Sequence, residues 1–193
     1  MSAALQPPMS LDAFLDWERR QDTKHEFDGT RPVAMAGGSV EHAAIQANLM
    51  FAIGARLLGG PCRMYGSDLK ISAAGSIRYP DAFVVCSPVP RGASVVDDPV
   101  VVFEVLSRST SFTDRIEKNL EYRRMPSIRR YVILEQTSQA ATVYARDGAD
   151  WKVETPMGES DLALPEIGLT VPLSELYRDV AFPTGHDGAG DGV

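Results

Sequence analysis

Apolar residues recur along this chain at the spacings of helices and strands. Ser10 is typical of a helix N-cap, and the apolar positions after it predict a short helix to about Arg20. A longer stripe predicts a second helix over 40–58, which Gly59-Gly60-Pro61 ends. Its expected inner face consists of His42, Ile45, Leu49 and Ile53.

Shorter apolar runs between turn residues predict strands. Asp28-Gly29 indicates a hairpin turn between strands over 24–27 and 31–35. The run 100–106 is so uniformly apolar that it should be central and covered on both faces. A helix from about 111 to 125 follows, stopped by Pro126. Further strands are expected over 63–73, 78–86, 131–135, 141–146 and 151–154.

Two acids stand in or beside these apolar strands. Glu104 lies inside the run Val100-Val-Val-Phe-Glu104-Val-Leu106, and Asp81 follows Tyr79-Pro80 at the mouth of another strand. A buried carboxylate is costly unless a cation or hydrogen-bond donors compensate it. Two such acids predict a shared cation. The alternatives are a turn aspartate at Asp81 and a glutamate that is protonated or paired with arginine at position 104.

Lys118 is the expected third member of this group. With Asp114 and Tyr122 it forms an i, i+4, i+8 row that can face the strand carrying Glu104. Magnesium is commonly held by one or two carboxylates, several waters and substrate phosphate. The three residues therefore predict metal-assisted hydrolysis, with Asp81 and Glu104 as ligands and Lys118 assisting the attacking water. An exposed helical pair of Asp114 and Lys118 is the alternative.

Composition narrows the class of protein. The 193 residues, 44% of them apolar, suit one domain over 1–182, and the polar tail 183–193 is expected to be disordered. The lack of a membrane-length apolar run and of a signal peptide pattern predicts a cytoplasmic protein. Cys62 and Cys86 are too few for a tetrathiolate zinc site and are expected to be buried free thiols.

Charge is unevenly distributed. The net charge of -7 argues against broad non-specific binding to nucleic acid. The segment 108–130, however, carries seven basic residues against three acids. Arg108, Arg123 and Arg124 are its candidates for phosphate contacts, and a solvated helix face is the alternative interpretation.

The order of these motifs resembles a known family. Tyr79-Pro80-Asp81, Val-Val-Phe-Glu104-Val-Leu, Asp114-Arg-Ile-Glu-Lys118 with Tyr122, and Tyr131-Val-Ile-Leu are similar to the Uma2 family of restriction-endonuclease-like proteins, within the PD-(D/E)XK nuclease superfamily. The resemblance begins with the N-terminal helix and Glu26-Phe-Asp-Gly29 and extends to about Tyr177. Its order and spacing are specific, although each motif is weak alone.

The resemblance implies an α/β fold with a mixed sheet flanked by helices, magnesium- or manganese-dependent cleavage of DNA, and a homodimer. By position, Asp81 and Glu104 are the two acids of the superfamily motif. The usual lysine would stand at Leu106, so Lys118 has to replace it from the helix. Family positions also suggest further neighbours of the site, namely His42, Glu26 and Asp68, and Gln46 lies one turn after His42.

Two other functions are compatible with the same residues. A non-catalytic, dimeric DNA-binding or interaction protein could retain the nuclease fold, and both the acidic charge and the displaced lysine leave room for it. A metal site of this kind could also hydrolyse RNA or another phosphoester. A fold alone does not choose among them.

Overall fold

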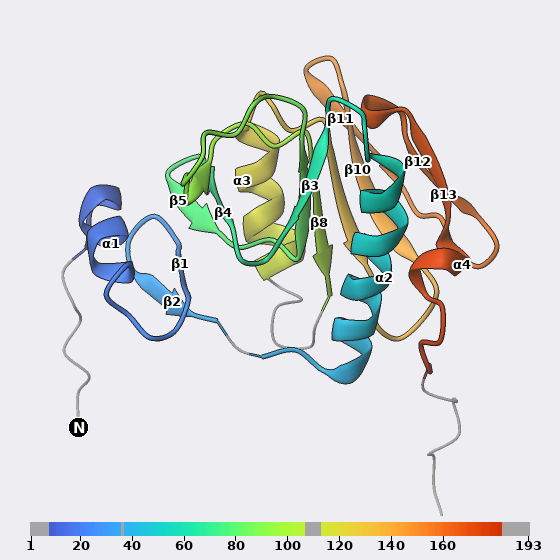
Figure 1. Cartoon of the computed structure of the whole chain (residues 1–193), viewed down its shortest axis with the longest axis horizontal. Helices are drawn as coiled ribbons and strands as arrows, with labels where there is room; N and C mark the ends of the chain where they lie inside the picture. The colour runs from blue at the N-terminus through green and yellow to red at the C-terminus, as the bar shows by residue number, and fades with distance from the viewer. Residues whose placement is uncertain (1–7, 36, 107–112, 183–193) are drawn as a thin grey trace, which may run out of the picture.

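Three sheets and the helices between them make up the computed structural model, which describes residues 8–35, 37–106 and 113–182 (Figure 1). The largest sheet has six strands. In spatial order they are β11 (Asp150–Glu154), β10 (Ala141–Asp147), β9 (Arg130–Leu134), β8 (Val101–Val105), β6 (Ala82–Val85) and β3 (Arg63–Gly66). Only the pair β8 and β9 is parallel in this sheet, so the sheet is mixed, as expected.

A second sheet of five strands stands beside the first. Its order is β2 (Pro32–Ala34), β1 (His25–Phe27), β5 (Ser76–Arg78), β4 (Lys70–Ala73) and β7 (Val95–Val96). The predicted hairpin at Asp28-Gly29 forms its edge, as β1 and β2. Helix α1 (Leu11–Glu18), capped by Ser10 as predicted, packs Phe14 on this sheet against Phe27 and Ile77.

The central strand β8 is covered on both faces, as its apolar run predicts. Helix α2 (Val40–Arg56) covers one face, and the hairpin β12 (Asp161–Leu164) and β13 (Leu169–Pro172) with the short α4 (Leu173–Leu176) completes that layer. Helix α3 (Asn119–Arg124) covers the other face and lies between the two sheets (Figure 1). Glu104 is therefore enclosed, and only a partner can stabilise its charge.

Three expected elements differ from those observed. The expected strand 63–73 is divided into β3 and β4, which lie in different sheets. The expected strand 78–86 is divided into β5 and β6, because Pro80 has no N–H to donate to a ladder. The expected helix 111–125 is a π-helix over Thr113–Lys118 that continues into α3, and its predicted start at residue 111 lies outside the described residues.

The prediction of free thiols is wrong, because Cys62 and Cys86 form a disulfide. The β3–β6 pairing sets Arg63 opposite Val85, so one more residue along the ladder brings the two cysteines face to face. A pairing between distant segments decides this bond, and spacing along the chain does not reveal it.

Some expectations are left open. No helix within the described ranges is both long and apolar enough to cross a membrane, and the cytoplasmic location stays a prediction. The expected disorder of the tail 183–193 concerns a segment outside the described residues.

Candidate active site

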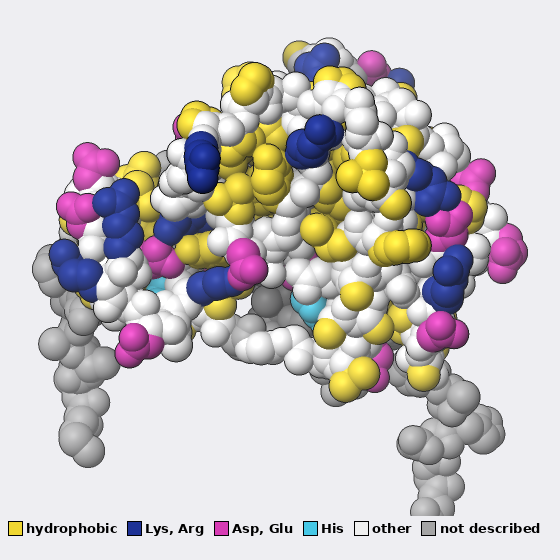
Figure 2. Space-filling model, viewed as in Figure 1, with side chains coloured by type: hydrophobic (Ala, Val, Ile, Leu, Met, Phe, Trp, Pro, Cys, Tyr) yellow, Lys and Arg dark blue, Asp and Glu magenta, His cyan; other side chains and the backbone are white. Residues whose placement is uncertain are grey.

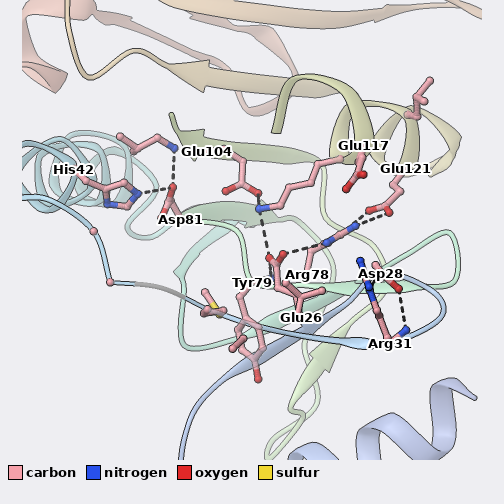
Figure 3. Close-up of a pocket in the computed structure, with 18 of the residues that line it drawn as sticks. Glu26, Asp28, Arg31, His42, Arg78, Tyr79, Asp81, Glu104, Glu117 and Glu121 are labelled. Atoms are coloured by element: carbon pink, nitrogen blue, oxygen red, sulfur yellow. Dashed lines mark hydrogen bonds and ion pairs between the residues drawn. The ribbon is translucent and has the colours of Figure 1, made fainter. Parts of the chain in front are cut away.

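A cavity of about 730 Å³ opens where the two sheets meet (Figure 3). Its wall comes from the β1–β2 hairpin, the start of α2, the segment Arg78–Asp81, the end of β8, and the helical stretch from Glu117 to Arg124. The labelled acids Asp81, Glu104 and Glu26 line it together with His42. Residues far apart in the sequence thus share one concave site.

Asp81 is held at the end of the β6–β8 ladder. Its Oδ2 accepts a hydrogen bond of 2.6 Å from the Val105 amide and lies 3.2 Å from His42 Nε2. The Gln46 side chain donates a 2.8 Å hydrogen bond to the backbone carbonyl of Asp81. Asp81 Oδ1 makes no hydrogen bond to any residue that the structure describes. One oxygen of the carboxylate is therefore fixed, and the other makes no bond within the described part of the chain.

Glu104 is buried within β8 and directly bonded to a cation. Lys118 Nζ donates a 2.8 Å hydrogen bond to Glu104 Oε1, and the Tyr122 hydroxyl donates to the same oxygen at 3.0 Å. Burial and the negative charge of Glu104 raise the pKa of Tyr122 well above its usual value, so this hydroxyl stays a neutral donor. The predicted row of Lys118 and Tyr122 does face Glu104.

A chain of alternating charges continues from Lys118. Glu26 Oε1 lies 3.4 Å from Lys118 Nζ, and Glu26 Oε2 accepts a 3.1 Å hydrogen bond from Arg78. Arg78 also binds Glu121 through two hydrogen bonds of 2.7 Å (Figure 3). Burial alone lowers the pKa of Arg78, but the bonds to Glu121 and the charge of Glu26 outweigh burial and raise it. The Lys118 ammonium is thus held between two carboxylates, those of Glu104 and Glu26.

The β6–β8 register brings the two predicted ligands together. Ala82 pairs with Phe103, so extending the ladder by one residue sets Asp81 opposite Glu104. Side chains opposite each other in an antiparallel pair have Cβ atoms about 4.5–5.5 Å apart. Figure 3 shows both carboxylates at the same part of the cavity.

These residues fit a magnesium or manganese ion that keeps most of its waters. Within the described ranges, no group of three or more His, Cys, Asp or Glu side chains is arranged to hold a metal. Two carboxylates beside an open cavity are nevertheless a usual set for magnesium, because water and substrate phosphate supply the other ligands. Asp81 Oδ1, which no described residue bonds, is the observation that favours this fit.

The other predicted neighbours divide into three groups. His42, Glu26 and Arg124 line the cavity, and Gln46 supports Asp81 from behind. Asp68 lies in an exposed turn, where it pairs with Lys24, and Arg123 does not line the cavity. Arg108 lies outside the described residues, so its expected phosphate contact stays a prediction.

Sequence reasoning missed two charged residues of this site, Arg78 and Glu121. A signal for Arg78 was present, because it ends an otherwise uncharged strand, Ser76–Arg78, directly before Tyr79-Pro80-Asp81. Like the buried carboxylate of Glu104, a buried guanidinium in such a strand requires a partner of opposite charge. Glu121 follows Glu117 by four residues on one helix face, but only the tertiary contact with Arg78 distinguishes it from a surface acid.

The fold is a mixed α+β fold, with mixed sheets flanked by helices. A solved structure described as a "putative nuclease belonging to DUF820", from Anabaena variabilis ATCC 29413, superimposes with a TM-score of 0.76. At 19% identity, over 88% of this chain and 98% of that one, the match shows a common fold.

The sequence comparisons identify the family. A model of the Uma2 family, described as "Putative restriction endonuclease", matches residues 11–174, and this chain belongs to that family. The uncharacterized protein slr1290 of Synechocystis sp. (strain ATCC 27184 / PCC 6803 / Kazusa) is 35% identical over 180 residues, which cover 91% of this chain and 95% of slr1290. The uncharacterized protein sll1609 of the same organism is 26% identical over 76% of this chain and 86% of its own length.

Proposed function

We propose that this protein is a metal-dependent endonuclease that hydrolyses phosphodiester bonds of DNA. The observation that carries the proposal is the pair of adjacent carboxylates, Asp81 and Glu104, with the Lys118 ammonium bonded to one of them inside a cavity. Its family is described as a restriction endonuclease family, which supports nucleic acid as the substrate class.

In this mechanism each side chain has a separate task. Asp81 and Glu104 would hold a magnesium or manganese ion, which would supply an acidified water and neutralise charge on the phosphate. The Val105 amide and His42 fix the orientation of Asp81. Lys118 Nζ, held by Glu104 and Glu26, would place a positive charge beside the attacking water and stabilise the negative charge that develops as this water loses its proton.

The direct test is nicking of supercoiled plasmid. Protein with magnesium or manganese should convert the plasmid to open circles, and a chelator should stop the reaction. Asp81→Asn and Glu104→Gln should each lower the rate at least about 100-fold, because metal ions stabilise such transition states by several kcal/mol. Gel densitometry over time measures the rate.

Asp161→Asn is a matched control, because Asp161 is an exposed acid on β12 outside the cavity. It should nick plasmid like the unchanged protein. If no DNA is nicked with either metal while the protein is folded and binds metal, the non-catalytic interpretation replaces this one. Cleavage of RNA in parallel, with competition between the two substrates, decides which nucleic acid is preferred.

We also propose that the protein is a homodimer, and the exposed face of α2 supports this. Apart from Arg56, the exposed positions of that helix are apolar, and the apolar stripe continues just beyond its end, at Val40, Ala43, Ala47, Phe51, Ala55 and Leu58. Phe51 and Leu58 expose 74% and 78% of their surface. Hydrophobic side chains are visible on the part of the surface where α2 runs (Figure 2). Such a continuous apolar stripe is typical of an interface.

Phe51→Glu should therefore convert the dimer to a monomer, because it places a charge in the middle of the apolar stripe that the dimer would bury. Sedimentation equilibrium at several concentrations measures the mass. Met157→Glu is the control, since Met157 is also an exposed apolar side chain, at 61%, but is not part of the α2 stripe and pairs with Ala140 in an isolated bridge. A protein that is monomeric throughout, or a Phe51→Glu variant that stays dimeric, would refute the proposed interface.

A further inference from the structure

Outside the cavity, a tryptophan and several arginines come together at the end of α3. Arg146 and Trp151 lie opposite each other in the β10–β11 pair, and the Arg146 guanidinium is 4.4 Å from the centre of the indole ring. The guanidinium of Arg123 lies 5.8 Å from the same ring. The sequence pointed to Arg123 as a phosphate contact, yet this residue does not line the cavity.

Arg146 has a structural role in this group. It donates hydrogen bonds to the backbone carbonyls of Ile128 (2.9 Å), Arg123 (3.0 Å) and Met125 (2.7 Å). It thereby ties the segment after α3 to the sheet and offers its flat face to Trp151. Arg146 fixes the ring, whereas Arg123 and Arg129 have exposed side chains.

Positive charge accumulates here without compensation. The Arg146 backbone amide donates a 2.8 Å hydrogen bond to the Arg129 carbonyl, so Arg129 lies beside Arg146. Partial burial, followed by repulsion from Arg129 and Arg123, lowers the pKa of Arg146. None of the three forms an ion pair with a residue that the structure describes. Asp147, next to Arg146 in the chain, pairs with Lys152 instead.

Several other arginines of this acidic protein are neutralised by carboxylates, although not all of them are: Arg63, for example, bonds to backbone carbonyls. Arg56 pairs with Glu175, Arg78 with Glu26 and Glu121, and Arg130 with Glu166. Like charges held together cost free energy, and a bound anion would remove that cost. The unpaired cluster therefore indicates a polyanionic ligand.

The position of the cluster indicates which polyanion. Arg124 lines the cavity. Arg123 precedes it on the same helix, so its side chain points about 100° away around the helix axis, toward Trp151. Lys118, at the other end of this helical stretch, is bonded to Glu104. A chain of phosphates bound at the cavity can therefore continue past Arg124 onto Arg123 and Arg129.

We propose that Arg123, Arg129 and Trp151, which we name the arginine–tryptophan patch, bind the backbone of the nucleic acid beyond the cavity. The two arginines contact phosphates, Trp151 packs against the strand, and Arg146 is a positioning residue that holds Trp151. This inference rests on the proposed function for its choice of ligand.

Binding of a fluorescein-labelled DNA duplex in a chelating buffer tests the patch without cleavage. In Arg123→Gln/Arg129→Gln, fluorescence anisotropy should show affinity at least about tenfold weaker. The dependence of affinity on salt should be less steep by about 1.8, because each lost phosphate contact removes about 0.9 from the slope. Arg19→Gln/Arg20→Gln removes two exposed arginines near the end of α1 and should change both quantities much less. The proposal would be overturned if both double variants lost the same affinity for DNA, or if Arg123→Gln/Arg129→Gln lost none.

Trp151 also provides a local signal. The chain has two tryptophans, so Trp17→Phe leaves Trp151 as the only one. Its emission should change on addition of unlabelled duplex and saturate at the concentration found by anisotropy. Circular dichroism confirms that this variant is folded. Saturable DNA binding without any change in Trp151 emission would place the contact elsewhere and refute the patch.

Failure of this proposal and failure of the nuclease proposal give different results. A specific loss of binding in Arg123→Gln/Arg129→Gln, together with no nicking, supports the patch and refutes the nuclease. Metal-dependent nicking with normal binding by the same variant supports the nuclease and refutes the patch. If anionic lipid vesicles bind the patch and the duplex does not, the ligand class is wrong and the proposal falls.

Discussion

Replacing Arg78 with methionine should lower the free energy of unfolding by about 3–5 kcal/mol. Arg78 is 2% exposed and is bonded to Glu26 and Glu121 from β1 and α3. Methionine fills part of the space but leaves Glu121 without its cation and Glu26, among the cations that the structure describes, with Lys118 alone, at 3.4 Å. Denaturant unfolding followed by circular dichroism measures the change.

The matched control is Arg56→Met, because Arg56 makes the same two-bond contact with Glu175 at the surface, at 2.9 Å for each bond. Exposed pairs contribute about 1 kcal/mol or less, so this variant should lose little stability. A double variant, Arg78→Met/Glu121→Met, should lose less than the sum of its single variants, because it also removes one of the stranded charges. If Arg78→Met costs no more than Arg56→Met, burial does not govern the strength of this network.

The arrangement of the central strands was largely predictable. Val101–Val105 is uniformly apolar apart from Glu104, and such a run requires cover on both faces, which α2 and α3 provide. The hairpin at Asp28-Gly29 followed from local turn chemistry. Signals of this kind lie within a few residues, so a sequence contains them completely.

The division into two sheets was not predictable in the same way. Residues 63–73 were predicted as one strand, but they contain the turn residues Gly66-Ser67-Asp68, and the turn at Ser67–Leu69 sends β3 to one sheet and β4 to the other. Strand assignment depends on which distant segment pairs with each half, and periodicity does not encode this. The Cys62–Cys86 disulfide has the same origin, since it follows from the β3–β6 register.

Some residues of the candidate site were likewise predictable from the sequence, and others were not. Asp81, Glu104 and Lys118 were identifiable because a charge in an apolar strand requires a partner, and the partner of Glu104 is the predicted lysine. Arg78 and Glu121 escaped because their partners come from distant segments: Arg78 bonds to Glu26, 52 residues earlier, and to Glu121, 43 residues later. Asp68 resembled a site residue by position alone, and the β3–β4 turn directs it to Lys24 at the surface.

Lys118→Met should separate catalysis from metal binding. The variant keeps the length of the side chain and loses its charge. Cleavage of DNA should fall by about 10²–10⁴-fold, the range for a group that assists proton transfer in the transition state. Binding of Mn²⁺ should remain as tight or become tighter, because an ammonium 2.8 Å from Glu104 no longer competes for that carboxylate. Glu104→Gln, in contrast, should lose both cleavage and metal binding.

A second buried pair supplies the control for this experiment. Lys70 Nζ lies 2.6 Å from Glu18 and is buried like Lys118, but neither Lys70 nor Glu18 lines the cavity. Lys70→Met should therefore cost similar stability, about 3–5 kcal/mol, while the folded molecules keep their nuclease activity. Plasmid nicking is measured at a temperature where circular dichroism shows both variants folded, and free Mn²⁺ is followed by electron paramagnetic resonance. Equal cleavage by the two variants would make Lys118 a structural partner of Glu104 and would remove it from the catalytic mechanism.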